Sequence, residues 1–267
     1  MNINTKYSNL IRYLKNLESV LIAFSGGVDS TFLLAAAKEA LGNNMKAITI
    51  ASPYIPKWEI KEARELANEI GVNHDIIEVP ISLEIRNNPQ NRCYLCKKFI
   101  FTRIKDIALK EGYKHVIDGS NFDDTKDYRP GLVALNELNI ESPLMECKLT
   151  KKEIRELSKK LKLKTWDKPA YACLLTRIPY GEELKTQEFE KIEKAEKYLM
   201  SIGFRAVRVR THGDLARIEV KKEERKKLFD EKLMDNISKS LKELGFKYVS
   251  LDMEGYRTGS FNETIEK

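Results

Sequence analysis

The chain has 267 residues, of which 42% are hydrophobic and 33% are charged, and its net charge is +7. This length predicts one main domain with a smaller one appended, and the absence of any run of about 18 apolar residues argues against a membrane span. Lysines are scattered without blocks of like charge, so the positive charge suits phosphorylated small molecules, and a nucleic-acid partner is disfavoured.

The first twenty residues predict an amphipathic helix with lysines throughout, and they lack the apolar centre of a signal peptide. We therefore expect a cytoplasmic protein without a membrane partner. In that reducing compartment, the four cysteines are expected as metal ligands or reactive thiols rather than as disulfides.

A buried strand at 20–24, a glycine turn and a helix at 31–41 are predicted next. Consecutive glycines let the backbone approach a ligand closely, and the helix N-terminus offers free N–H groups and a positive dipole end, so the turn favours phosphate. The sequence SGGVDS resembles the PP-loop, S-G-G-x-D-S, of ATP pyrophosphatases, which split ATP into AMP and pyrophosphate. Its matching residues are Ser25, Gly26, Gly27, Asp29 and Ser30.

A parallel α/β sheet is predicted around the PP-loop. Further strands are expected at 46–50, 74–79 and 115–118. A helix at 57–70 separates the first two, and a turn-rich loop at 87–96 followed by a helix that ends at Gly112 precedes the last. Helical connections of this length imply right-handed crossovers, and ligands of such sheets bind at the carboxyl ends of the strands. The segment DGSNFDD at 118–124 follows a strand in this way. It fits hydroxyl and metal contacts and an ordinary turn equally well.

The second half of the chain changes character near Gly181. A capping box, Thr150 to Glu153, predicts a helix at 149–161, whereas 166–181 has no periodicity and is more typical of a site than of a connector. The remaining elements are expected as a helix at 183–201, a hairpin of 204–210 and 215–220, a helix at about 222–244 and a strand at 246–251. We predict a PP-loop domain at 1–181 and a smaller α+β domain, for substrate binding or oligomerisation, at 182–267.

Three of the four cysteines are candidates for one metal centre. Cys93 and Cys96 form C-x-x-C, a spacing that lets two thiolates reach one metal, although redox and zinc motifs share it. Cys173 follows in the aperiodic segment, while Cys147 lies in an apolar stretch typical of a buried free cysteine. Three alternatives remain open: an iron–sulfur cluster bound by Cys93, Cys96 and Cys173, a zinc site, or no metal. A cluster with one iron lacking a protein ligand would hold an extra sulfide that attacks an acyl-adenylate.

Six segments along nearly the whole chain carry a more specific similarity. They are FSGGVDS (24–30), DGSNFDD (118–124), RPG (129–131), WDKPAYACLLTRIPYG (166–181), RVRTHGDLARIEV (208–220) and LDMEGYRTGSFN (251–262). Together they resemble the ATP-dependent sacrificial sulfur transferases of nickel-pincer nucleotide biosynthesis, the LarE family. The resemblance implies adenylation of the carboxylates of pyridinium-3,5-biscarboxylic acid mononucleotide, followed by sulfur insertion.

The resemblance also implies a source for the sulfur. In family members with a single cysteine, that residue corresponds to Cys173, which gives up its sulfur and becomes dehydroalanine. The added Cys93 and Cys96 make this chain similar to the three-cysteine branch, in which a [4Fe-4S] cluster carries the transferred sulfide. We therefore expect ATP, Mg²⁺ and a [4Fe-4S] cluster as cofactors, with sulfide or another sulfur donor as a partner.

The expected catalytic residues are Cys173 and Asp29, the latter assisting Mg²⁺ and phosphate binding. The family also implies that Arg208 and Arg210 bind a substrate phosphate. Their i, i+2 spacing places both on one strand face, and arginine suits bidentate phosphate recognition, although solvated arginines on an edge strand are the alternative. Glu219, in the facing strand, is a candidate for positioning substrate, or simply a structural residue. A homo-oligomer is expected.

Three other functions remain open from the sequence. A PP-loop tRNA thiolase often carries zinc-ribbon cysteine pairs or an RNA-binding appendage, and neither is visible. An ammonia-using amidating synthetase would need no cysteine trio. A nucleotide sensor would bind ATP without releasing pyrophosphate.

Overall fold

The computed structural model describes residues 2–126, 129–169 and 171–257 and divides into two compact units. The PP-loop unit comprises residues 1–82 and 91–170, and the hairpin unit comprises 83–90 and 171–267. The domain boundary between 181 and 182 stays a prediction. No helix in the described ranges combines the length and apolarity that crossing a membrane requires.

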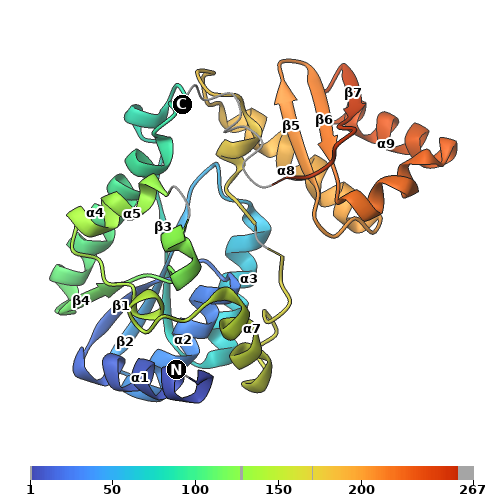
Figure 1. The fold of residues 1–267 in the computed structure, drawn as a ribbon. Helices are drawn as coiled ribbons and strands as arrows, with labels where there is room; N and C mark the ends of the chain where they lie inside the picture. Colours follow the sequence, from blue (N-terminus) through green and yellow to red (C-terminus); the bar gives the residue numbers. More distant parts are fainter. Residues whose placement is uncertain (1, 127–128, 170, 258–267) are drawn as a thin grey trace. The chain divides into compact units, whose positions relative to one another are not determined.

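A four-stranded parallel sheet forms the centre of the PP-loop unit, which confirms the predicted α/β class (Figure 1). The strands are β1 (Val20–Ala23), β2 (Met45–Ala51), β3 (Asn73–Glu78) and β4 (His115–Ile117), in the order β3-β2-β1-β4. Both neighbours of β1 are parallel to it, with Val20 opposite Met45 on one side and His115 on the other. The PP-loop therefore leaves the sheet at a central strand.

Helices cover both faces of this sheet. They are α1 (Ile3–Asn16), α2 (Val28–Leu41), α3 (Lys57–Ile70), α4 (Arg92–Glu111), α5 (Pro130–Glu137), α6 (Pro143–Glu146) and α7 (Lys151–Lys160). Successive residues of β1 point to opposite faces: Val20 and Ile22 join a core with α1, α2, α3 and α7, whereas Leu21 joins one with α4 and α5. The alternation explains why β1 is apolar throughout.

The predicted helix boundaries depend on identifiable residues. The capping box is present: the Thr150 side chain accepts the Glu153 N–H, and the Glu153 carboxylate accepts the Thr150 N–H. Helices α3 and α4 end at Gly71 and Gly112, both left-handed, as glycine permits at a helix end. Helices α5 and α6 were not predicted, because both are short and begin at a proline.

The hairpin unit contains α8 (Thr186–Ser201), β5 (Arg208–His212), β6 (Leu215–Glu219), α9 (Glu231–Glu243) and β7 (Tyr248–Leu251). Strands β5 and β6 are antiparallel, which confirms the predicted hairpin, and β7 adds to β6 in parallel. A single apolar core joins α8, the three strands and α9.

The expected helix at 222–244 is wrong in one respect. The chain forms a 3₁₀ segment, Lys222–Phe229, and only then α9. Asp230 separates them, because its carboxylate accepts the N–H of Leu233 at 2.8 Å and so begins a new helix. Short 3₁₀ helices also occur at Leu83–Ile85, Phe122–Lys126 and Leu174–Arg177.

Candidate active site

The PP-loop connects the end of β1 to the start of α2 through a tightly packed turn. Gly26 has a φ of +68°, and a Cβ on it would lie 3.2 Å from Cα and Cβ of Ala63 in α3. Glycine is therefore required both by the backbone conformation and by the neighbouring helix. The hydroxyls of Ser25 and Ser30 lie 3.0 Å apart, one at each end of the loop. Backbone amides and two hydroxyls thus converge at the N-terminus of α2, as phosphate binding requires.

The turn after β4 packs directly against this loop. A Cβ on Gly119 would lie 3.0 Å from the backbone nitrogen of Ser30. The adjacent Asp118 accepts hydrogen bonds at 2.6 Å from the hydroxyls of both Ser120 and Ser142. The carboxyl ends of β1 and β4 therefore meet, as the parallel sheet predicted. Asp118 holds the turn in place.

The other carboxylates of the DGSNFDD segment also have protein partners. One oxygen of Asp123 accepts the backbone N–H of Lys151 at 2.9 Å, and the other accepts the Lys126 ammonium at 2.8 Å. Asp124 pairs with Arg129 at 2.9 Å. These contacts support the interpretation of the segment as a structural turn that anchors α7.

Asp29, the acidic residue of the PP-loop, lies in the first turn of α2 and faces a lysine. Its Oδ2 is 2.5 Å from Nζ of Lys151, whereas no described group makes a hydrogen bond to its buried Oδ1. Burial raises the pKa of Asp29, and the ammonium of Lys151 opposes this shift. A carboxylate with an unsatisfied oxygen beside a phosphate loop suits Mg²⁺, which binds carboxylates together with substrate phosphates.

A second lysine contacts the PP-loop from the beginning of the aperiodic segment. Lys168 donates from Nζ to the Gly26 carbonyl at 2.9 Å and to Glu62 at 2.8 Å, and its ammonium lies 6.0 Å from the Trp58 ring centroid. Sequence reasoning missed both Lys168 and Lys151. The sequence offers only weak local signals for them: Lys168 precedes a proline, and Lys151 directly follows the N-cap residue Thr150.

The C-x-x-C pair lies at the start of α4, so the loop expected at 87–96 is wrong from Arg92 onward. An i, i+3 spacing places the two side chains on one helix face. Cys93 is exposed, and Cys96 Sγ lies 3.3 Å from the hydroxyl of the buried Tyr54. Burial raises the pKa of the Cys96 thiol, and the Tyr54 hydrogen bond opposes the shift. Cys147 packs against the core that includes α1 and α2, but it is half-buried rather than fully buried as expected from the sequence.

Cys173 belongs to the other unit, directly before the 3₁₀ helix Leu174–Arg177. Its carbonyl accepts the N–H of Thr176 and the guanidinium of Arg177, both at 3.2 Å. Within the described residues, no three cysteine, histidine or acidic side chains are gathered as metal ligands. The donor set fits a cluster in part: two thiols share a helix face in one unit, and the third thiol belongs to the hairpin unit.

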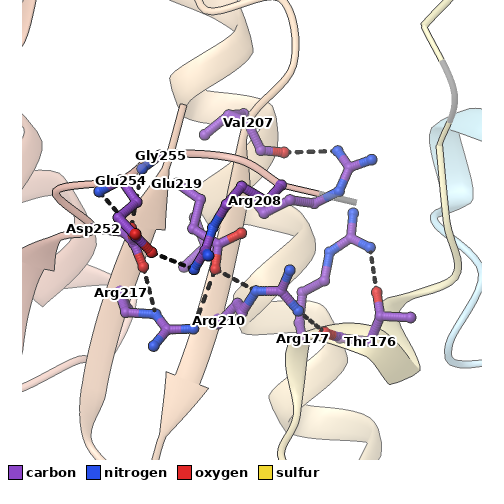
Figure 2. A network of polar contacts seen from close by, with 12 residues as sticks. Thr176, Arg177, Val207, Arg208, Arg210, Arg217, Glu219, Asp252, Glu254 and Gly255 are labelled. Atoms are coloured by element: carbon purple, nitrogen blue, oxygen red, sulfur yellow. Dashed lines mark hydrogen bonds and ion pairs between the residues drawn. The ribbon is translucent and has the colours of Figure 1, made fainter. Parts of the chain in front are cut away.

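The hairpin unit contains a buried cluster of arginines and glutamates (Figure 2). Arg210 contacts Glu219 at 2.5 Å through Nε and donates to the Thr176 carbonyl at 2.6 Å. Arg208 donates to the Val207 carbonyl at 2.9 Å. Arg208 and Arg210 are only 2% and 4% exposed, so they are not solvated arginines of an edge strand.

The cluster has an excess of positive charge. Three buried guanidinium groups, on Arg177, Arg208 and Arg210, accompany two buried carboxylates, on Glu196 and Glu219, in the described part of this unit. Burial lowers the pKa of Arg208, and the positive charges of the other two arginines lower it further. An anion such as a phosphate would offset this repulsion.

Aromatic rings flank Arg208. The ring centroids of Tyr256 and Tyr171 lie 4.8 and 5.9 Å from its guanidinium carbon. Arg210 and Arg217 contact the same carboxylate oxygen of Glu219, Arg217 at 3.2 Å. The other oxygen of Glu219, Oε2, is buried and has no hydrogen-bond partner in the described ranges. Arg177, which forms a bidentate pair with Glu196 at 2.8 and 3.0 Å, was not predicted as a partner in this cluster.

Comparison with known proteins gives a full-length match. A pyridinium-3,5-bisthiocarboxylic acid mononucleotide synthase of Lactiplantibacillus plantarum is 38% identical, with 98% of this chain and 96% of the relative aligned. The chain belongs to the LarE family. An uncharacterised protein of Synechocystis is 40% identical over 99% of this chain and all of the relative. An uncharacterised protein of Methanocaldococcus jannaschii is 37% identical over 94% of this chain and 95% of the relative.

A family model for asparagine synthase matches residues 12–84, which include the PP-loop. This match covers 73 of the 267 residues, so it shows similarity in the PP-loop region alone. Membership of the LarE family confirms the resemblance recognised in the sequence. The three-cysteine branch within that family stays a prediction.

Proposed function

We propose that this protein is an ATP-dependent sulfur transferase that converts pyridinium-3,5-biscarboxylic acid mononucleotide to its thiocarboxylate. The full-length similarity to a synthase named for the bisthiocarboxylic product carries this proposal. The PP-loop and the buried arginines support it, because the reaction needs a site for ATP and a site for the phosphate of the substrate mononucleotide. Each unit of the chain contains one of these features.

The first step is adenylation at the PP-loop. A substrate carboxylate oxygen attacks the α-phosphorus of ATP, and pyrophosphate leaves. Ser25, Gly26, Gly27 and Ser30 bind phosphate oxygens, and Asp29 would hold Mg²⁺, which would supply positive charge to the phosphates.

The second site recognises the substrate phosphate. Arg208 and Arg210 contact it, and Glu219 keeps Arg210 aligned through their 2.5 Å contact. A bound phosphate adds the negative charge that this buried cluster lacks. The arginines thereby fix the phosphate end of the substrate.

The second step is sulfur transfer. A sulfur nucleophile attacks the acyl carbon of the adenylate, and AMP leaves; the same sequence then acts on the second carboxylate. Cys93, Cys96 and Cys173 are the proposed ligands of a [4Fe-4S] cluster. When bound, such a cluster supplies sulfide as the nucleophile. In the alternative route, the thiolate of Cys173 attacks and its own Cβ–S bond later breaks, leaving dehydroalanine.

The direct test measures pyrophosphate release from ATP in the presence of candidate substrates. We expect release with pyridinium-3,5-biscarboxylic acid mononucleotide and only background with nicotinic acid adenine dinucleotide plus ammonia, or with tRNA. The Asp29→Asn variant should lose at least about two orders of magnitude in rate, because the Mg²⁺ ligand is weakened. Release that depends on tRNA, or on ammonia, would replace the proposal with a thiolase or an amidating synthetase.

A further inference from the structure

Lys151 is fixed at the ATP site by its backbone as well as by its side chain. It is the first residue of α7, and its N–H donates to Asp123 at 2.9 Å, directly after the capping box at Thr150. Asp123 follows β4, so α7 begins at the same edge of the sheet as the PP-loop. Helices α2 and α7 pack in one core, and the contact between Asp29 and Lys151 joins their first turns.

The side chain of Lys151 occupies the carboxylate that Mg²⁺ would use. Its Nζ lies 2.5 Å from Oδ2 of Asp29, and Oδ1 of the same carboxylate is buried without a hydrogen-bond partner in the described structure. A magnesium ion at Oδ1 and an ammonium at Oδ2 would repel each other across the same carboxylate. Binding of the metal therefore favours movement of the ammonium, and the long lysine side chain permits this.

Among the charged groups near Asp29, Lys151 is the one that can leave the carboxylate when a metal binds. Arg155 also acts on Asp29, but its guanidinium donates to the carbonyls of Trp166 and Lys168 at 2.7 and 2.8 Å. Asp124, the nearby acidic group, is paired with Arg129. Lys151, by contrast, is anchored only through its backbone and the Asp29 contact in the described structure.

We propose that Lys151 neutralises Asp29 in the nucleotide-free protein and transfers to the β- and γ-phosphates when magnesium and ATP bind. This inference rests on the ATP-dependent adenylation proposed above and adds a phosphate-binding residue to it. Lys151 keeps the carboxylate ready for the metal and then stabilises the leaving pyrophosphate. No covalent bond changes in the exchange.

Two equilibrium measurements on the full chain test the exchange without turnover. Binding of magnesium pyrophosphate is measured by calorimetry, and binding of Mn²⁺ without nucleotide is measured by electron paramagnetic resonance. In Lys151→Met we expect pyrophosphate to bind about tenfold or more weakly, because a charge-assisted hydrogen bond is lost. Mn²⁺ should bind several-fold more tightly, since its competitor is gone.

Lys152→Met is the matched control, because Lys152 is the next residue of α7 and is exposed. It should behave like the unmodified protein in both measurements. Lys151→Arg should restore most of the pyrophosphate affinity. Unchanged pyrophosphate affinity in Lys151→Met, or Mn²⁺ binding that is unchanged or weaker, would overturn the exchange. Neither measurement uses the sulfur-accepting substrate, so failure of the proposed reaction would leave both results intact.

Discussion

Arg208 and Arg210 share a strand face but have different surroundings. Arg210 is tied to the Glu219 carboxylate and the Thr176 carbonyl, whereas Arg208 lies beside the ring of Tyr256. A cation beside an aromatic ring is stabilised without being neutralised. Arg208 is therefore better suited to supply net charge to a phosphate, and Arg210 to hold the cluster together.

Replacing the two arginines separates these contributions. Arg210→Met leaves Glu219 buried with Arg217 as its ion-pair partner in the described ranges, so we expect the free energy of unfolding to fall by about 3 kcal/mol. Arg208→Met should cost less stability but raise the KM for the mononucleotide about tenfold or more, with the KM for ATP unchanged. Urea unfolding and initial-rate kinetics measure the two effects.

Arg205→Met serves as the control, because Arg205 lies in the same segment with an exposed side chain. It should change neither stability nor KM. Equal losses of stability in Arg208→Met and Arg210→Met would contradict the division of roles.

The sequence predicted the placement of individual residues where the signal was local. The i, i+2 rule placed Arg208 and Arg210 on one face, and the SGGVDS pattern located the glycine turn between β1 and α2. It did not predict the pair of Arg177 with Glu196 or that of Lys151 with Asp29. In both pairs the partners come from different elements, so their contact depends on packing that no local pattern contains.

At the scale of elements, the segment after β7 is fixed to the hairpin by a glycine. Gly255 has a φ of +78°, and a Cβ on it would lie 2.6 Å from the Val220 carbonyl oxygen. The next residue, Tyr256, donates its N–H to that oxygen at 2.8 Å. The glycine thus allows the close approach that sets the Tyr256 ring beside Arg208.

Gly255→Ala should therefore disturb both stability and substrate binding. We expect unfolding to become easier by about 2 to 3 kcal/mol, from the positive φ and the steric clash together, and the KM for the mononucleotide to rise. Gly213→Ala is the control: Gly213 has a φ of +60° in the hairpin turn, but a Cβ there meets nothing within 4 Å. It should cost only about 1 kcal/mol and leave KM unchanged. Equal costs for the two would argue against a clash at Val220.

The elements themselves were largely predictable, because most follow apolar periodicity and end at glycines. The exceptions have physical reasons. Asp230 divides the expected helix at 222–244 by capping α9, and a single polar residue inside a charged run gives little warning of a boundary. The parallel addition of β7 to β6 depends on the long connection through α9, which sequence pattern does not orient.

At the scale of the whole molecule, the proposed cluster would draw its ligands from both units. Cys93 and Cys96 lie in the PP-loop unit and Cys173 in the hairpin unit. Each thiol is then required, because three ligands at about 2.3 Å must converge on one centre.

Anaerobic purification tests this directly through iron and acid-labile sulfide content and the absorption spectrum. We expect about four irons per chain in the unmodified protein, the number in a [4Fe-4S] cluster, and loss of the brown colour in Cys93→Ala and in Cys173→Ala. Cys147→Ala is the matched control and should keep its iron, because Cys147 packs against the apolar core of α1 and α2. A colourless protein that cannot be reconstituted, together with a mass loss at Cys173 after turnover, would instead establish the route that sacrifices the cysteine.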